Sequence, residues 1–368
     1  MTISIRKKLA GVAVVAGVAL ALTGCGQAPE APNTGDDNAA APEASDFLPC
    51  IVSDMGGFDD KSFNQLSFEG AEKAADEIGV PLKPVESNAE TDYGPNMDSL
   101  VAENCNAIVA VGFALSEATV DSALANAEID YIIVDDAADN DFDGETDAPN
   151  IKPLLYNTAE AAFLAGYLSA GFSEAGKVGT FGGMEFPTVT IFMDGFKQGV
   201  DHYNEVNGKS VQVFGWDGSS GSFTGGFEAN QDAKNTAVNI LDQGVDVLMP
   251  VGGPVYQSAL QAIKELDRDV ALIGVDADLF ETDPNTQDFV LTSVLKQMDV
   301  STYEAVMSSA NGSFDATPYV GTLENGGVGI ADLHNFADKV DAALMSEVEA
   351  LQQDIIDGTI VVKSYLDN

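Results

Sequence analysis

The chain has few basic side chains. Lysine and arginine together number 16, against 59 aspartates and glutamates, and the formal net charge is −43 over 368 residues. A surface potential of that sign repels phosphate groups, so we exclude nucleic acid as a partner and expect a neutral or cationic small molecule rather than a nucleotide. Histidine is also scarce: neither His202 nor His334 follows a predicted strand with a nucleophile nearby, as covalent catalysis would need.

Sequence motifs of two enzyme classes are missing. The first strand-to-helix turn lacks the Gly-x-Gly-x-x-Gly of dinucleotide-binding folds. It also lacks the Asp-x-Asp-x-x-x-Asp-Asp of calcium-dependent nucleoside hydrolases, because Val52 and Phe58 occupy two of the aspartate positions around Asp54. We therefore predict a protein that is not an enzyme.

An apolar run long enough to span a membrane is missing at the N-terminus. Arg6-Lys7-Lys8 precede an apolar run over residues 9–22 that ends at Leu22-Thr-Gly-Cys25. This pattern predicts a signal peptide over residues 1–24 with a lipid on Cys25, the alternative being an ordinary signal with a coincidental cysteine. Residues 25–46 are rich in Ala, Pro and acidic residues and predict a flexible tether. We expect a lipid-anchored protein on the extracytoplasmic face of the cell membrane.

Cysteine is rare, and only Cys50 and Cys105 remain once Cys25 is assigned to the lipid. Each stands just ahead of an apolar run that looks like a strand. If the two strands are parallel neighbours, their starts lie side by side, and an extracytoplasmic setting would let the pair oxidise. We predict a disulfide, with two buried free thiols as the alternative.

The chain after the tether alternates between apolar strand-like runs and amphipathic helical patterns, which is typical of parallel sheets covered by helices on both faces. Its length suits two lobes. The predicted strands are residues 50–53, 81–85, 107–111, 131–134, 177–181, 211–214, 245–249 and 271–275, with 289–295 crossing back toward the first lobe. The predicted helices are residues 64–78, 92–103, 115–126, 158–172, 188–206, 228–243, 255–266 and 338–357.

The first strand leads into a Gly-Gly turn and a helix start, with the sequence Asp54-Met-Gly-Gly-Phe-Asp-Asp-Lys-Ser-Phe-Asn-Gln65. Ligands of open α/β sheets bind at such strand ends. Asp54, Phe63 and Asn64 could therefore face one pocket. A ring at a helix start can stack on a planar base, although core packing is the common role of phenylalanine. Asn64 offers a donor and an acceptor, or could instead cap the helix.

This segment closely resembles the signature of the basic membrane lipoprotein family of ABC-transporter solute receptors, which includes purine nucleoside receptors. The resemblance continues through Phe163-Leu-Ala-Gly-Tyr167, Lys177-Val-Gly-Thr-Phe-Gly-Gly-Met184, Val251-Gly-Gly253, Ile273-Gly-Val-Asp276 and Thr292-Ser-Val-Leu-Lys296. It implies a type I periplasmic-binding-protein fold with three crossovers forming a hinge. We expect one lobe from residues 47–157 plus about 297–325, and the other from 158–296 plus about 326–368.

The resemblance also implies roles for single residues. An aspartate at the end of the strand 131–134 contacts the base in the resembled receptors; we favour Asp135, with Asp136 as the alternative register. Asp276 and Lys296 look like the family's pair that holds the ribose, although they could also form a hinge salt bridge without touching ligand. Gly252 and Gly253 would bring backbone close to the ligand. The second aromatic residue that stacks on the ligand could be Phe186, Phe223, Phe227 or Tyr256, and we favour Phe186.

One acidic segment has the Asp-x-Asp-x-Asp-Gly opening of a calcium loop. Asp139, Asp141, Asp143 and Glu145 are the candidate ligands, but the twelfth position is Asn150 instead of the bidentate glutamate that normally closes such a site. We expect weak binding of a structural calcium ion, and in so acidic a chain the pattern can also arise by chance. We predict no other cofactor.

The interpretation favoured by the sequence is a receptor that closes on a purine nucleoside and delivers it to the permease and ATPase subunits of an ABC transporter. Two alternatives keep the same fold. The ligand could be a free sugar, with Phe63 stacking on a pyranose and Asp276 and Lys296 binding hydroxyls. The lipoprotein could instead sense a ligand and signal through a partner.

Overall fold

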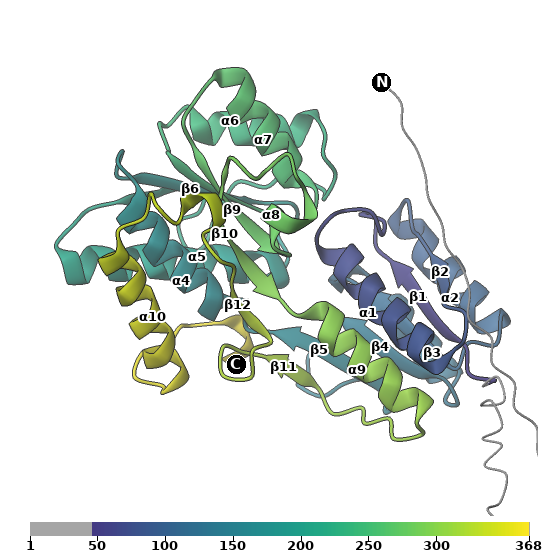
Figure 1. Cartoon of the computed structure of the whole chain (residues 1–368). Coiled ribbons are helices and arrows are strands. Elements are labelled where there is room, and N and C mark those ends of the chain that lie inside the picture. Colours follow the sequence, from purple (N-terminus) through teal and green to yellow (C-terminus); the bar gives the residue numbers. More distant parts are fainter. Residues whose placement is uncertain (1–45, 368) are drawn as a thin grey trace, which may run out of the picture. The chain divides into compact units, whose positions relative to one another are not determined.

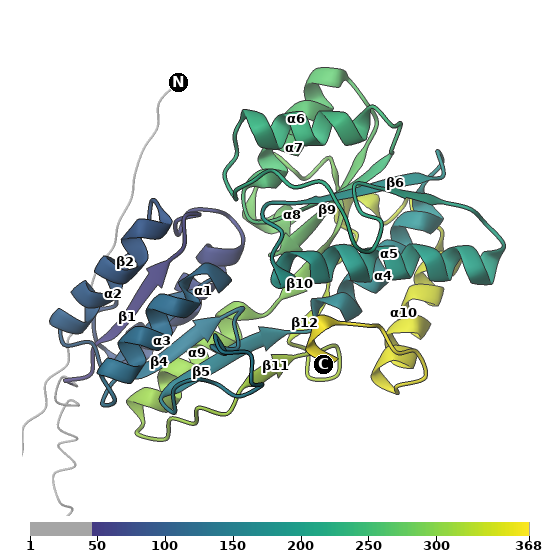
Figure 2. The same cartoon turned by 180° about the vertical axis from the view of Figure 1, so that it is seen from behind.

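The computed structural model describes residues 46–367, which form two lobes, each built on a six-stranded sheet (Figures 1 and 2). The predicted signal peptide, the lipidated Cys25 and nearly all of the predicted tether lie outside the described residues. Within residues 46–367, no helix combines the length and the apolar character needed to cross a bilayer.

The sheet of the first lobe, here called the N-lobe, has the strand order β11-β5-β4-β3-β1-β2, and all of its pairings are parallel. The strands are β1 (Pro49–Ser53), β2 (Lys83–Val85), β3 (Ala107–Val111), β4 (Asp130–Val134), β5 (Ile151–Tyr156) and β11 (Tyr319–Gly321). The helices are α1 (Phe63–Ile78), α2 (Tyr93–Ala102), α3 (Ser116–Ala125) and α9 (Met298–Ala310).

Apolar side chains of the central N-lobe strands point toward both faces of the sheet, as expected of a parallel sheet covered by helices on both sides. Ile51 and Val109 pack in the same core as Ala71 of α1, whereas Val52 and Ile108 pack with Leu100 of α2. Helices α1 and α9 lie side by side on one face, although they are more than two hundred residues apart in sequence (Figure 1).

The sheet of the second lobe, the C-lobe, has the order β12-β10-β9-β8-β6-β7, with β12 antiparallel to β10. The strands are β6 (Lys177–Gly182), β7 (Gln212–Phe214), β8 (Val247–Val251), β9 (Ala271–Asp276), β10 (Val290–Lys296) and β12 (Val328–Ile330). The helices are α4 (Thr158–Phe172), α5 (Pro187–Asn207), α6 (Gln231–Leu241), α7 (Val255–Leu266), α8 (Leu279–Thr282) and α10 (Ala342–Ile356).

Helices α4 and α5 pack closely because small residues line their contact. A Cβ added to Gly166 would lie 2.0 Å from the carbonyl oxygen of Phe196, and one added to Gly199 would lie 2.0 Å from the carbonyl oxygen of Phe163. Neither glycine can therefore be enlarged without separating the helices. This contact explains the Phe-Leu-Ala-Gly segment, in which Gly166 serves packing rather than ligand binding.

Three chain segments cross between the lobes: β5 to α4 near residue 157, β10 to α9 near residue 297, and β11 to β12 over residues 322–327. The sheets therefore contain strands from residues 49–156 and 319–321 in the N-lobe and from residues 177–296 and 328–330 in the C-lobe. The predicted α/β fold of two lobes is confirmed. Helix α10 packs on α4 of the C-lobe.

Cys50 and Cys105 form a disulfide with a Cα–Cα distance of 6.0 Å. Cys50 lies in β1, which pairs in parallel with β3, and Cys105 comes two residues before β3. Both side chains are buried beneath α2, so the bridge ties the starts of two central strands together inside the N-lobe core.

Candidate functional site

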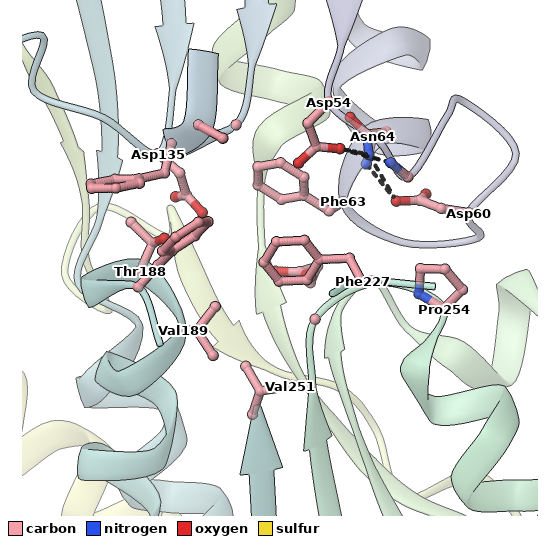
Figure 3. Close-up of a pocket in the computed structure, with 18 of the residues that line it drawn as sticks. Asp54, Asp60, Phe63, Asn64, Asp135, Thr188, Val189, Phe227, Val251 and Pro254 are labelled. Atoms are coloured by element: carbon pink, nitrogen blue, oxygen red, sulfur yellow. Dashed lines mark hydrogen bonds between the residues drawn. The ribbon is translucent and has the colours of Figure 1, made fainter. Parts of the chain in front are cut away.

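A pocket lies between the lobes, at the carboxyl ends of strands from both sheets (Figure 3). This is the position where open α/β sheets bind ligands. From the N-lobe the pocket is lined by Asp54, Gly56, Asp60, Phe63, Asn64, Gly112, Phe113, Ala114 and Asp135. From the C-lobe it is lined by Phe186, Thr188, Val189, Phe192, Phe227, Val251, Gly252, Gly253, Pro254, Asp276 and Lys296.

The side of the pocket nearest α1 is polar and tightly hydrogen-bonded. The side-chain amide of Asn64 donates to Asp54 at 2.8 Å and to Asp60 at 3.3 Å (Figure 3). Asp54 also accepts the backbone N–H of Gly56 at 3.0 Å. These bonds fix the Asn64 amide with its nitrogen toward the carboxylates, and its Oδ1 is buried without a hydrogen-bond partner. Such an unpaired acceptor is costly unless a ligand donor reaches it.

A buried cation lies where the two lobes meet. The Lys296 ammonium group donates to Asp135, and it lies 3.6 Å from Oδ1 of Asp276. The same ammonium lies over the rings of Phe63 and Phe192, each at 5.1 Å from the centroid. Carboxylates and aromatic faces together compensate a charge that would be expensive to bury alone.

Asp135 and Asp276 occupy matching positions, one in each lobe. Asp135 follows β4 and has a φ of 65°, and Asp276 ends β9 with a φ of 68°. Aspartate tolerates this left-handed region better than most residues, and here it turns both side chains toward the pocket.

Burial raises the pKa of every carboxyl group that lines the pocket. For Asp60 and Asp276, desolvation is the main cause and the pKa rises to about 6. The pKa of Asp54 is raised by burial, against the opposing effect of its bond from Asn64. The pKa of Asp135 is also raised by burial, against the attraction of Lys296. The site therefore offers many hydrogen-bond acceptors around one cation, which suits a ligand rich in hydroxyl or N–H donors.

Aromatic rings form the remaining walls. Phe63 comes from the first turn of α1, and Phe113 of the N-lobe contacts Phe186 of the C-lobe with ring centroids 4.9 Å apart. Phe186 also lies 5.9 Å from Phe227. Gly252 has a φ of 129°, and a Cβ there would lie 2.7 Å from the Phe227 ring, so only glycine leaves space for this wall.

All predicted ligand-binding residues except Asp136 line this pocket. Asp136 requires a correction: its carboxylate accepts the Ser116 hydroxyl at 2.5 Å and the Ala138 backbone N–H at 2.6 Å, and it faces an adjoining cavity. It therefore caps the following turn. Among the stacking candidates, Phe223 and Tyr256 are not among the residues that line the pocket.

Several lining residues were not singled out from the sequence, among them Asp60, Phe113 and Phe192. Asp60 lies inside the first motif, and its position two residues before the helix N-cap was an available signal. Phe113 follows the end of β3, where the strand-end rule would have pointed to it. Phe192 lies within α5 and resembles any core phenylalanine, so no sequence signal marks it.

The acidic loop after Asp136 brings together the carboxylates of Asp139, Asp141 and Asp147, whose ligand atoms lie within 4.8 Å of one another. Asp143 and Glu145, predicted as ligands, are not in this group. The Asp143 carboxylate accepts the backbone N–H of Glu145 at 2.9 Å instead, and so stabilises the turn. Asp147 was not among the candidates.

Two lobes with mostly parallel sheets, joined by three crossovers and separated by a pocket of polar and aromatic side chains, define a type I periplasmic-binding-protein fold. Residues 49–365 match the family described as ABC transporter substrate-binding protein, PnrA-like, and the chain belongs to that family. It is therefore a substrate-binding protein of an ABC transporter, which implies a small-molecule ligand and permease and ATPase partners.

Individual relatives agree with this assignment. The "ABC transporter nucleoside-binding protein BmpA" of Lactococcus lactis subsp. cremoris is 26% identical over 337 residues, which cover 87% of this chain and 90% of the relative. A protein of Pyrococcus abyssi described as an uncharacterized lipoprotein is 28% identical over 299 residues, covering 79% of this chain and 70% of the relative. The crystal structure of an ABC-transporter solute-binding protein from Aeropyrum pernix K1 matches with a TM-score of 0.76 and 26% identity, covering 87% of this chain and 95% of that chain.

Proposed function

We propose that the chain binds a purine nucleoside between its lobes. The observation that supports this most directly is the position of Asp276. Its Oδ1 is buried without a hydrogen-bond partner, 3.6 Å from the Lys296 ammonium. A carboxylate and an ammonium group side by side can accept from and donate to the vicinal hydroxyls of one ribose.

The base would lie against the Phe63 ring, which faces the same pocket (Figure 3). Stacking on an aromatic ring is worth about 1 to 3 kcal/mol per base. The free Oδ1 of Asn64 and the Asp54 carboxylate would accept N–H groups from the edge of the base. The acidic lining disfavours phosphate, so a nucleoside is a better ligand than a nucleotide.

Ligand contacts from both lobes make closure depend on the cargo. Phe63 and Asn64 belong to the N-lobe and Asp276 to the C-lobe, so a nucleoside can use all three only when the lobes are together. The cargo then favours the closed form to the extent that it binds this form more tightly than the open form. The closed form presents the loaded receptor to the permease.

We further propose that lipid attached to Cys25 holds the receptor at the extracytoplasmic face of the membrane. The signal-like N-terminus and the Leu-Thr-Gly-Cys sequence support this, as does the relative described as a lipoprotein. Mass spectrometry of the protein purified from membranes should show a diacylglycerol-modified Cys25 as the first residue. An unmodified chain cleaved elsewhere would contradict the proposal.

The ligand can be tested by calorimetric titration with guanosine, inosine, adenosine, cytidine, ribose and galactose. We expect stoichiometric binding of the purine nucleosides alone. Asp276→Ala should abolish this binding while leaving the fold intact, whereas Asp288→Ala, at an exposed aspartate that does not line the pocket, should bind as the wild type does. Binding of free sugars alone would refute the nucleoside proposal, and unchanged affinity in Asp276→Ala would remove that residue from the site.

A further inference from the structure

Ser62 occupies the N-cap position of α1, where a serine hydroxyl normally accepts a hydrogen bond from the first turn of the helix. Here the Ser62 side chain makes no capping hydrogen bond. The side chain is fully buried. A buried hydroxyl that leaves its usual partner must have another, and the contacts around it identify that partner.

Asp60 takes over the capping of α1. Its carboxylate accepts the backbone N–H groups of Ser62 at 2.9 Å, Asn64 at 2.9 Å and Gln65 at 3.1 Å. Three of the helix's free donors are thereby satisfied by one side chain from the preceding loop. The Ser62 hydroxyl is left available for a contact outside its own helix.

That contact crosses the cleft. The Ser62 hydroxyl lies 3.0 Å from the backbone carbonyl of Val275 and 3.2 Å from Oδ2 of Asp276, both in β9 of the C-lobe. The two oxygens of Asp276 thus differ in their surroundings. Oδ2 lies against the serine of the opposite lobe, whereas Oδ1 has no hydrogen-bond partner and lies beside Lys296.

We propose that Ser62 is a positioning residue: by holding Oδ2 of Asp276 from the opposite lobe, it directs Oδ1 at the vicinal hydroxyls of the cargo. This inference rests on the proposed function. Ser62 and Asp276 come from different lobes, so the carboxylate is held in this way only while the lobes are closed. Selection for a ribose is then completed by closure, and a ligand lacking the hydroxyls gains little from the Ser62 contact.

The test compares guanosine, inosine and adenosine with their 2′,3′-dideoxy analogues on the full chain. Hydrogen bonds to charged groups typically contribute enough to change affinity by about tenfold or more. Ser62→Ala should therefore weaken ribonucleoside binding by about tenfold or more and dideoxynucleoside binding by less than about threefold. The ratio of the two affinities is the deciding readout, because general loosening of the helix would weaken both ligands alike.

Ser67→Ala is the matched control. Ser67 is a buried serine of the same helix, but its hydroxyl donates at 3.2 Å to the carbonyl of Phe63 within α1 and not to the other lobe. Its variant should keep the wild-type ratio. Ser62→Gly repeats the test if Ser62→Ala does not fold, because glycine is well tolerated at N-cap positions.

The contrary outcome is a ratio of ribonucleoside to dideoxynucleoside affinity that stays at its wild-type value in the Ser62 variant, whether both affinities are unchanged or both fall equally. Either result would overturn the assignment of Ser62 while leaving the nucleoside proposal intact. Failure of the wild-type chain to bind any of the three ribonucleosides would instead overturn the proposed function itself.

Discussion

The ammonium group of Lys296 donates a hydrogen bond to the carboxylate of Asp135, across the boundary between the two lobes. Lys296 ends β10 of the C-lobe sheet and Asp135 follows β4 of the N-lobe sheet. Oδ1 of Asp276 lies 3.6 Å from the same ammonium group. The strand ends of both lobes thus share one buried positive charge.

Removal of this charge should destabilise the protein in a pH-dependent manner. Breaking a buried ion pair typically costs about 3 to 5 kcal/mol, because the remaining charge is left uncompensated. Lys296→Met should therefore lower the free energy of unfolding by an amount in this range at pH 8, which is above the raised pKa of about 6 of Asp276. At pH 5 the loss should be smaller, because carboxyl groups with raised pKa values take up protons instead.

Urea unfolding at the two pH values measures the effect. Lys264→Met is a suitable control, because Lys264 is exposed and lies over the Phe289 ring, away from the pocket. A loss of stability in Lys296→Met that is equal at pH 5 and pH 8 would show that Lys296 contributes packing and not charge compensation.

The carboxyl groups of the cleft predict how stability varies with pH. Burial raises the pKa of Asp60 and Asp276 to about 6 from the usual 3.8. The folded protein therefore binds protons near pH 5 that the unfolded chain has released. The stability that these groups contribute is fully present below about pH 4 and is lost as the pH rises through about 6.

Asp60→Asn isolates part of this dependence. The slope of unfolding free energy between pH 4 and 6 should become less steep by up to about 1.4 kcal/mol per pH unit in the variant. Unfolding should be measured at high salt, where repulsion among the many surface carboxylates is screened. Identical slopes in the two proteins would show that Asp60 has an ordinary pKa.

Much of the fold was predictable because buried parallel strands leave continuous apolar runs between turn signals. Strand β3 and helices α4 and α7 begin and end at the predicted residues. Strand β5 was missed because it contains Pro153, and a proline in the sequence argues against a strand interior. Strands β11 and β12, with three residues each, were also missed.

The site was predictable to the extent that its residues follow strand ends. Asp135 and Asp276 meet this condition, and the left-handed φ that turns each toward the pocket is one that aspartate tolerates. The partners of the side chains were not predictable. The bond from Ser62 to Asp276 joins residues 214 positions apart, and such contacts depend on how the two lobes pack.

Phe63 should contribute to affinity for a base and not for a free sugar. Loss of a stacking ring costs about 1 to 3 kcal/mol per base, so Phe63→Ala should weaken purine nucleoside binding by about five- to 150-fold. Phe68→Ala is the control, because Phe68 of the same helix packs on Phe58, with centroids 5.0 Å apart, and does not line the pocket. Equal affinities of wild type and Phe63→Ala in calorimetric titration would exclude stacking by Phe63.

Calcium should stabilise the protein weakly if the loop after Asp136 binds it. Asp139, Asp141 and Asp147 supply oxygen ligands near one another, but no bidentate glutamate closes the site. Extracellular calcium modules have dissociation constants of about 10⁻⁴ to 10⁻³ M, which corresponds to about 1.4 to 2.7 kcal/mol of stabilisation at about 10 mM calcium. Thermal unfolding with calcium and with a chelator measures this, and Asp141→Asn should remove the difference. Equal melting temperatures in the wild type would exclude the ion.

Salt should stabilise the protein more strongly than is usual. With a net charge of −43, carboxylates repel one another more in the compact state than in the unfolded chain. The screening length shortens from about 10 Å at 0.1 M salt to about 3 Å at 1 M, which removes most repulsion between neighbouring surface groups. The denaturant midpoint in urea should therefore rise with potassium chloride between these concentrations. Sodium chloride should act equally, because the effect depends on ionic strength. A midpoint independent of salt would show that the acidic surface serves solubility at no cost in stability.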